Sequence, residues 1–82
     1  MKVLVSCYDI KANSYSVPFG VNTKDEARRS FGDALKDQNT LLGQHPEDFI
    51  LMAVGTFDEQ TGIIEVFSDK ECLALGSDYS QG

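Results

Sequence analysis

The fold depends on residues 45–58, His-Pro-Glu-Asp-Phe-Ile-Leu-Met-Ala-Val-Gly-Thr-Phe-Asp, which contain the longest apolar run of the chain, Phe49 to Val54. Consecutive apolar residues without a period-two alternation are typical of an interior strand that is buried on both faces. Pro46 before the run and Gly55 after it leave too little room for a helix. The run therefore predicts a central strand that is covered on both sides.

The residues at the N-terminus predict a β-hairpin. Apolar side chains at Val3, Val5 and Cys7 recur at every second position, as in a strand. Residues 9–14 break this alternation and are interpreted as a loop. The second arm would be residues 15–19, and it belongs at the edge of the sheet because its proline cannot donate a ladder hydrogen bond.

A helix is predicted to begin at Thr23, which forms a capping box with Glu26: the hydroxyl accepts from the Glu26 amide, and the carboxylate reaches back to the Thr23 amide. Helical spacing then places one set of side chains on a stripe toward the sheet. This stripe consists of Ala27, Phe31, Ala34, Leu35 and Gln38. The helix should end within residues 36–39, and Pro46 suits a single helical turn that leads into the central strand.

A second hairpin is predicted after the central strand. Gly62 suits the positive φ of a bulged turn over residues 58–62, and a fourth strand follows over residues 63–67. Ser68 or Asp69 would cap a short turn that runs to residue 75. We expect one domain over residues 1–76 and a flexible tail over residues 77–82.

These elements predict an α+β fold in the order β-β-α-β-β, with a four-stranded, mainly antiparallel sheet and one helix packed on one face. The opposite face would draw on Leu4, Tyr8 and apolar residues of the third and fourth strands. It would need a cover, either the C-terminal turn or another copy of the chain. Because 82 residues form only a modest core, we expect a homodimer or a higher homo-oligomer.

The composition restricts the function. Thirteen acidic and seven basic residues give a net charge of −6, which argues against a broad phosphate-binding surface but allows a local basic patch. Cys7 and Cys72 are expected to be reduced thiols, because no secretion signal accompanies them. No segment is long enough to cross a bilayer, so we expect a cytoplasmic protein without a membrane partner.

No residue pattern predicts an enzyme. His45 lies near Glu47 and Asp48, but a lone histidine before a proline is more often a cap or a surface residue, and no second histidine or cysteine has ligand spacing. The acidic hairpin at residues 58–62 lacks the oxygen spacing of a calcium loop. Neither cysteine has a histidine placed to activate it. We expect no catalytic residue, no metal and no cofactor.

Two features are candidates for contact with DNA or with a protein. Arg28 and Arg29, with Lys24 one turn earlier, form the densest basic feature and suit phosphates or the acids of a partner. An ion-paired helix surface is the alternative, because Asp25 and Asp33 lie at helical spacing from the arginines.

The aromatic residues of the first hairpin are the second candidate. Tyr8, Tyr15 and Phe19 are suited to stack on unpaired bases beside Lys11. Core packing is the alternative explanation for the same three side chains.

Several sequence blocks together resemble one viral family. The blocks are Lys2-Val3-Leu4-Val5-Ser6-Cys7-Tyr8-Asp9, Pro18-Phe19, Arg29-Ser30-Phe31, His45-Pro46-Glu47-Asp48-Phe49, and Gly55-Thr56-Phe57-Asp58 followed by Thr61-Gly62. From Met1 to about Phe67 the chain resembles the small nonstructural protein of gokushoviruses, which are single-stranded-DNA bacteriophages of the Microviridae.

The resemblance implies a noncapsid protein of the type labelled DNA-binding, with a suggested role in the switch from double-stranded to single-stranded genome synthesis. It brings no catalytic residues. We expect a phage accessory protein of genome replication in the host bacterial cytoplasm, which binds single-stranded DNA through the first hairpin and the face of Arg28 and Arg29. The alternative is an acidic interaction module that binds a host or phage replication factor without contacting DNA.

Overall fold

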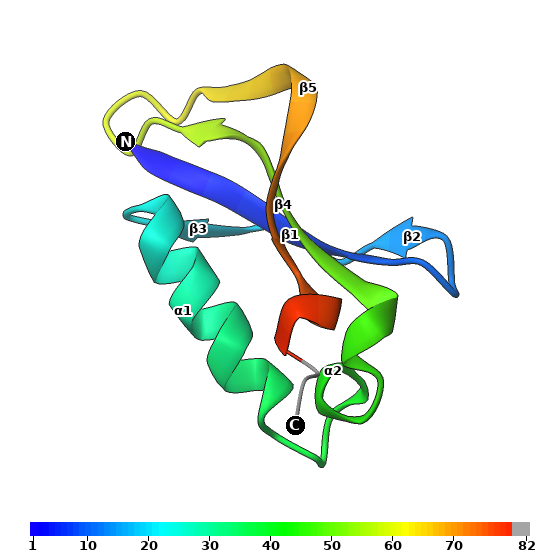
Figure 1. Ribbon diagram of the computed structural model, residues 1–82. Coiled ribbons are helices and arrows are strands. Elements are labelled where there is room, and N and C mark those ends of the chain that lie inside the picture. The colour runs from blue at the N-terminus through cyan, green and yellow to red at the C-terminus, as the bar shows by residue number, and fades with distance from the viewer. Residues whose placement is uncertain (80–82) are drawn as a thin grey trace.

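The computed structural model describes residues 1–79, in which an antiparallel sheet carries a helical layer on one face (Figure 1). The strands are β1 (Lys2–Asp9), β2 (Ser14–Tyr15), β3 (Phe19–Val21), β4 (Phe49–Phe57) and β5 (Ile64–Leu75). The helices are α1 (Lys24–Leu35) and α2 (Leu41–Gln44), and two 3-10 turns are η1 (Pro46–Asp48) and η2 (Gly76–Tyr79). The α+β class, the antiparallel sheet and the long helix on one face are confirmed.

The strands lie in the order β2-β1-β4-β5, and β3 also pairs with β1. Tyr15 of β2 is opposite Tyr8, and Phe19 of β3 is opposite Val5, so β2 and β3 occupy the same edge of β1. They are the two halves of the predicted second arm. The proline of that arm lies between them, which agrees with the expected edge position.

Ser16 replaces the missing ladder bonds where this edge is interrupted. Its hydroxyl accepts from the amide of Cys7 at 3.0 Å, and its carbonyl accepts from the buried hydroxyl of Ser6 at 2.7 Å. The simple order β-β-α-β-β is therefore not what the chain adopts, because the second arm is split into two strands. A second helix also follows the first, since the hydroxyl of Thr40 caps α2 by accepting from the amide of Gly43 at 3.1 Å.

The start of α1 follows the predicted cap with one difference. The Thr23 hydroxyl accepts from the Glu26 amide at 3.1 Å, but the Glu26 carboxylate accepts from the amide of Asn22 rather than that of Thr23. Most of the predicted stripe faces the sheet. The buried residues of α1 are Ala27, Phe31, Gly32 and Leu35. Ala34 is only half-buried, and Gln38 lies beyond the end of the helix and is exposed.

The central strand β4 is covered well on one face only. Phe49, Leu51 and Ala53 are buried on the face toward α1, whereas Ile50 and Met52 on the other face are half-buried. The expectation that both faces would be buried is therefore wrong. The cause is the single helical layer, which leaves the other face without a second layer in residues 1–79.

The strand β5 is much longer than the predicted fourth strand. The predicted turn over residues 68–75 is wrong, because Glu71 and Cys72 pair with Ala53 and Met52 of β4. The register shifts where β5 passes from Val66, opposite Gly55, to Glu71. Three of the four residues in between, Ser68, Asp69 and Lys70, are polar, and a polar, irregular stretch of an edge strand has the same sequence pattern as a turn.

The C-terminal turn η2 packs on the helical side. The rings of Tyr79 and Phe31 meet edge to face, with their centroids 5.8 Å apart. Residues 77–79 of the expected tail thus form part of η2, and residues 80–82 lie outside the described residues. Because η2 lies beside α1, it does not cover the opposite face of the sheet.

The hairpin between β4 and β5 has the predicted turn. Gly62 has a φ of 76°, and the Asp58 amide donates to the carbonyl of Ile63 at 2.9 Å. A hydrogen bond from the amide of Gln60 lowers the pKa of the Asp58 carboxyl. None of the helices in residues 1–79 is long and apolar enough to span a membrane.

Candidate nucleic-acid interface

We call the sheet face opposite α1 the outer face. Side chains that are paired across antiparallel strands lie on the same face, so the strand register defines its members. They are Lys2, Leu4, Ser6, Tyr8, Tyr15, Ile50, Met52, Phe57, Ile64, Val66, Cys72 and Leu75. Most are apolar or aromatic, and several of the large ones are exposed. A face of this kind is available for a ligand or a partner.

Two tyrosines form a pair at one end of the outer face. The rings of Tyr8 and Tyr15 are tilted by 48°, with centroids 4.7 Å apart. The Tyr8 hydroxyl donates to the side-chain oxygen of Asn13, which has a φ of 55°, a left-handed conformation that asparagine tolerates. The hairpin loop thus holds Tyr8 in place, while Tyr15 remains 46% exposed.

Lys70 completes this cluster from the opposite edge of the sheet. Its Nζ lies 5.6 Å from the centroid of the Tyr15 ring, within the range of a cation–π interaction. In a flat sheet, β2 and β5 would be about 14 Å apart, because β1 and β4 lie between them. The contact therefore requires a strongly curved sheet. We call Tyr8, Tyr15 and Lys70 the tyrosine–lysine cluster.

Phe19 lies on the opposite face of the sheet from the two tyrosines. It lines an apolar pocket of about 230 Å³ on the helical side of the sheet, together with Cys7 and Phe31. Phe19 thus lies on the helical side of the sheet, where it is 44% exposed and outside the buried core, whereas Tyr8 and Tyr15 lie on the outer face. Lys11 lies in the loop between β1 and β2, where its backbone amide donates to the Asp9 carboxylate at 3.0 Å.

Two cations of the helical basic feature are already bound within the chain. Lys24 forms an ion pair with Glu71 of β5, with 2.6 Å between the charged atoms. Arg28 pairs with Asp25 at 2.6 Å and donates through Nε to the carbonyl of Leu73 at 3.0 Å. These side chains attach α1 to β5, so the ion-paired surface is the better interpretation for both.

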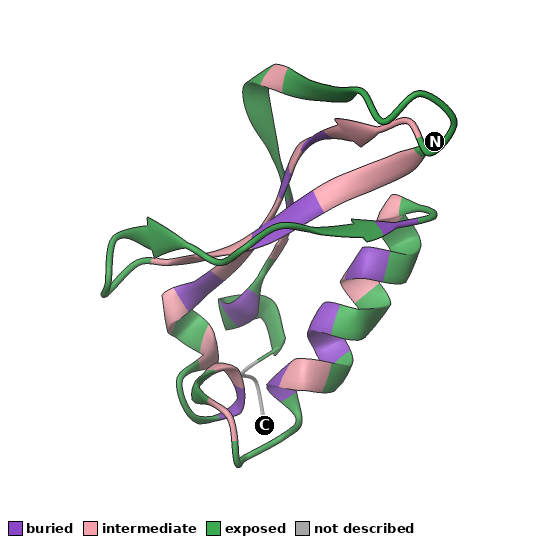
Figure 2. Ribbon diagram, turned by 180° about the vertical axis from the view of Figure 1, so that it is seen from behind, coloured by how far each residue is buried: buried purple, intermediate pink, exposed green. Residues whose placement is uncertain are grey.

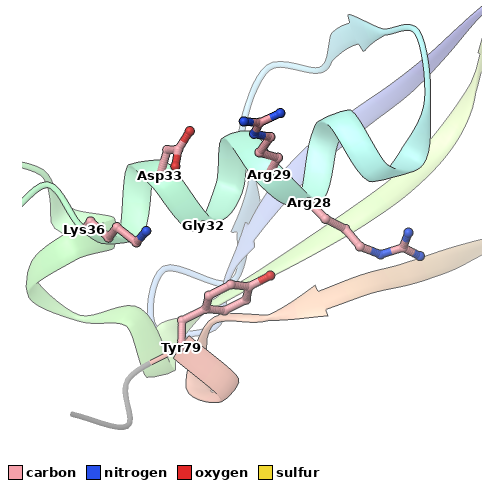
Figure 3. Close-up of a pocket in the computed structure, with 6 residues that line it drawn as sticks. All are labelled: Arg28, Arg29, Gly32, Asp33, Lys36 and Tyr79. Atoms are coloured by element: carbon pink, nitrogen blue, oxygen red, sulfur yellow. The ribbon is translucent and has the colours of Figure 1, made fainter.

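A groove runs along α1, on the helical side of the molecule beside Tyr79 (Figure 3). It has a volume of about 590 Å³ and is lined by Arg28, Arg29, Gly32, Asp33, Lys36 and Tyr79. Tyr79 lies beside the helix turn at Gly32, and Arg28 points away from Lys36 toward β5. Among residues 1–79, Arg29 has no ion pair within 4 Å. Its lining has three cations and one acid, Asp33, and Arg28 is paired with Asp25, so the groove has a modest net positive charge.

His45 and two acids lie close together at η1. One ligand atom from each of His45, Glu47 and Asp48 falls within 4.8 Å of the others. The tight turn explains this proximity, since the Asp48 amide donates to the carbonyl of His45 at 3.0 Å. The cluster offers three ligands where a structural zinc site needs four, and it is largely exposed. We assign it no role.

The two cysteines are free and differ in environment, which predicts different reactivities. Burial raises the pKa of the Cys7 thiol, whereas Cys72 is exposed. At pH 8 we expect Cys72 to be alkylated rapidly and Cys7 slowly, because the thiolate is the reactive species. Time-resolved mass spectrometry measures both rates, and a Cys72→Ser variant should retain only the slow phase. Equal rates would contradict the described burial of Cys7.

Comparison with known proteins identifies the family. The family described as "Phage ORF5 protein" matches residues 2–79. This chain belongs to the phage ORF5 family. A relative in this family is Protein ORF5 of Chlamydia phage 1, which is 38% identical over 88 aligned residues that cover 93% of this chain and 91% of the relative. The resemblance drawn from the sequence blocks is thus confirmed for a small phage protein of the ORF5 family. No solved structure matches the chain.

Proposed function

We propose that this ORF5-family protein binds single-stranded DNA during replication of the phage genome in the host bacterial cytoplasm, through the tyrosine–lysine cluster. The observation that carries the proposal is the position of Tyr8, Tyr15 and Lys70 on an outer face that no second layer covers in residues 1–79. Aromatic rings beside a cation form the usual platform for unpaired bases. The proposed role is binding rather than catalysis.

The charge of the chain favours stacking as the main source of affinity. A net charge of −6 repels phosphates, so few of them can be neutralised on binding. Stacking on an aromatic side chain contributes about 1–3 kcal/mol per base and requires bases that are not paired. With Lys70 and Lys11 as the nearby cations, log K should fall with log salt with a slope of roughly −1.4. We therefore expect a preference for single strands and a shallow salt dependence.

The test is fluorescence anisotropy of labelled oligonucleotides at low and physiological salt. Tyr15→Ala is expected to weaken single-strand binding by roughly 5- to 150-fold, the loss of one stacked base. Tyr79→Ala is the matched control, because Tyr79 is 43% exposed, much like Tyr15, but lies in the helical groove. It should bind like the wild type. Tyr15→Phe should also bind well, since it keeps the aromatic ring.

Three results would count against this assignment. If the wild-type protein binds no oligonucleotide at low salt, the protein is not a DNA-binding protein. If Tyr79→Ala weakens binding and Tyr15→Ala does not, the helical groove is the interface. If duplex DNA binds as tightly as the single strand, stacking on unpaired bases is not the mode of recognition.

The acidic composition favours a second candidate, a module that binds a phage or host replication protein. Apolar side chains of the outer face would then form the core of a protein interface, and the acidic surface would form its rim. This candidate predicts no DNA affinity and a stoichiometric complex with an individually purified replication protein. Calorimetric titration of such proteins separates the two candidates.

A further inference from the structure

The strand β5 presents a long unpaired edge. It pairs with β4 on one side, and no strand of residues 1–79 lies on its other side. It has 12 residues and is exposed along most of its length (Figure 2). An unpaired edge offers a row of backbone donors and acceptors to another strand, and proteins normally protect such edges with charges, prolines, bulges or short strands.

The protection of β5 is uneven. In its middle, the charged residues Asp69, Lys70 and Glu71 lie at a bulge, which discourages pairing. The preceding residues 63–67, which include the start of β5, are protected much less, because Glu65 is their one charged residue. Three apolar side chains there are strongly exposed: Ile63 at 57%, Ile64 at 59% and Val66 at 80%.

The opposite edge of the sheet has the usual protection. The strands β2 and β3 have two and three residues, and Pro18 lies between them. Val17 is 87% exposed on this edge, yet no continuous strand surrounds it. Exposure alone therefore does not distinguish Val66 from Val17. The distinguishing feature of Val66 is its position in a regular, weakly charged stretch of strand.

We propose that residues 64–68 of β5 pair antiparallel with the same residues of a second copy of this chain, which forms a twofold dimer with one continuous sheet. Charge selects the register. With Val66 opposite Val66 of the partner subunit, Glu65 lies opposite the apolar Phe67 of the partner subunit. A centre at Glu65 would oppose two glutamates, and a centre at Phe67 would place Glu65 opposite Asp69 of the partner subunit. Like charges at directly opposed positions are destabilising, which disfavours both of these registers. A centre at Ile64 would place Val66 opposite Gly62 of the partner subunit, which lies in the hairpin turn and not in a strand. The proposed register therefore has Val66 at the twofold axis.

The dimer leaves the two tyrosine rings of the cluster open. The interface segment is paired with the end of β4 that lies beside Lys2 and Leu4, whereas Tyr8 and Tyr15 lie at the other end of β1. Loss of the dimer therefore does not remove the rings that are proposed to stack on bases. Dimerisation and DNA binding can be tested separately.

The first test is the mass of the protein in solution by sedimentation equilibrium. The wild type should have twice the 9.0 kDa mass of one chain. Val66→Lys should sediment as a monomer at concentrations where the wild type is dimeric, because the substitution places two lysines opposite each other at the axis. Val17→Lys is the matched control and should remain dimeric. Circular dichroism establishes that each variant is folded.

A second test keeps the proposal falsifiable if Val66→Lys does not fold. In a Cys72→Ser background, Val66→Cys should form a disulfide-linked dimer under mild oxidation, because directly opposed Cα atoms in antiparallel strands are about 4.5–5.5 Å apart, a distance that a disulfide can bridge. Val17→Cys in the same background should stay largely uncrosslinked. A monomeric wild type, a dimeric Val66→Lys, or equal crosslinking at the two positions would overturn the proposal.

Discussion

Replacing Gly76 by alanine is expected to lower the free energy of unfolding by about 3 kcal/mol, near the upper end for an overpacked site. A Cβ at this position would lie 1.8 Å from the carbonyl oxygen of Pro46 and 2.8 Å from that of Phe49. Both are backbone atoms of η1 and the start of β4, so neither can move aside as a flexible side chain can. The turn η2 would have to separate from the segment that leads into the central strand.

Thermal unfolding measures the effect of the Gly76 substitution. For a domain of this size, 3 kcal/mol corresponds to a Tm that is roughly 12–24 °C lower. Gly20→Ala is the matched control, because its Cβ would lie 3.4 Å from Cβ of Lys2, an ordinary contact. That variant should melt within a few degrees of the wild type. If both variants melt together, the close approach of Gly76 to Pro46 is not present in solution.

Leu51→Ala is the second substitution for which a large effect is expected, a loss of about 3 kcal/mol in the free energy of unfolding. Leu51 is fully buried between the sheet and α1. Truncation removes Cγ and both Cδ atoms with their packing contacts, and it leaves a cavity that the surrounding helix and strands can only partly fill. Urea unfolding followed by circular dichroism gives the value.

Met52→Ala provides the comparison on the neighbouring residue. Met52 lies on the outer face and is only half-buried, so its truncation should cost about 1 kcal/mol, well below the range for a fully buried methionine. The difference between the two variants measures how unequally the faces of β4 are covered. A similar loss for both would mean that a further layer covers the outer face in solution.

The helix and the turns were predictable because local chemistry specifies them. Thr23 and Glu26 mark the start of α1, and the apolar spacing from Ala27 to Leu35 identifies the buried face. Gly62 has the positive φ that its hairpin suggested. In each case the residues that decide the structure lie within a few positions of one another.

The sheet was harder to predict, because the whole fold decides whether a second layer buries both faces of a strand. The run from Phe49 to Val54 is apolar at every position, and nothing in those six residues indicates that the second layer is missing. The polar residues 68–71 have turn-like chemistry although they continue an edge strand. Their assignment depends on β4, which is distant in the sequence.

The candidate site was predictable in part. Tyr8 and Tyr15 were identified from the hairpin, since their partnership is local. Lys70 was missed, because it meets Tyr15 only through the curvature of the sheet. Asp25, the ion-pair partner of Arg28, lies at helical spacing and is visible in the sequence, whereas Leu73 and Glu71, which Arg28 and Lys24 contact on β5, are distant in the sequence. Sequence spacing cannot indicate such distant partners.

The pairing of β1 with β4 also has a consequence for the order of folding. It joins Lys2 to Phe57 and Asp9 to Phe49, so the middle of the sheet closes only after a long intervening segment has been enclosed. The two hairpins and the long helix have local contacts and carry a smaller entropic cost of loop closure. We therefore expect the chain to fold through early hairpins and a late joining of β1 to β4, at a rate set by that last step.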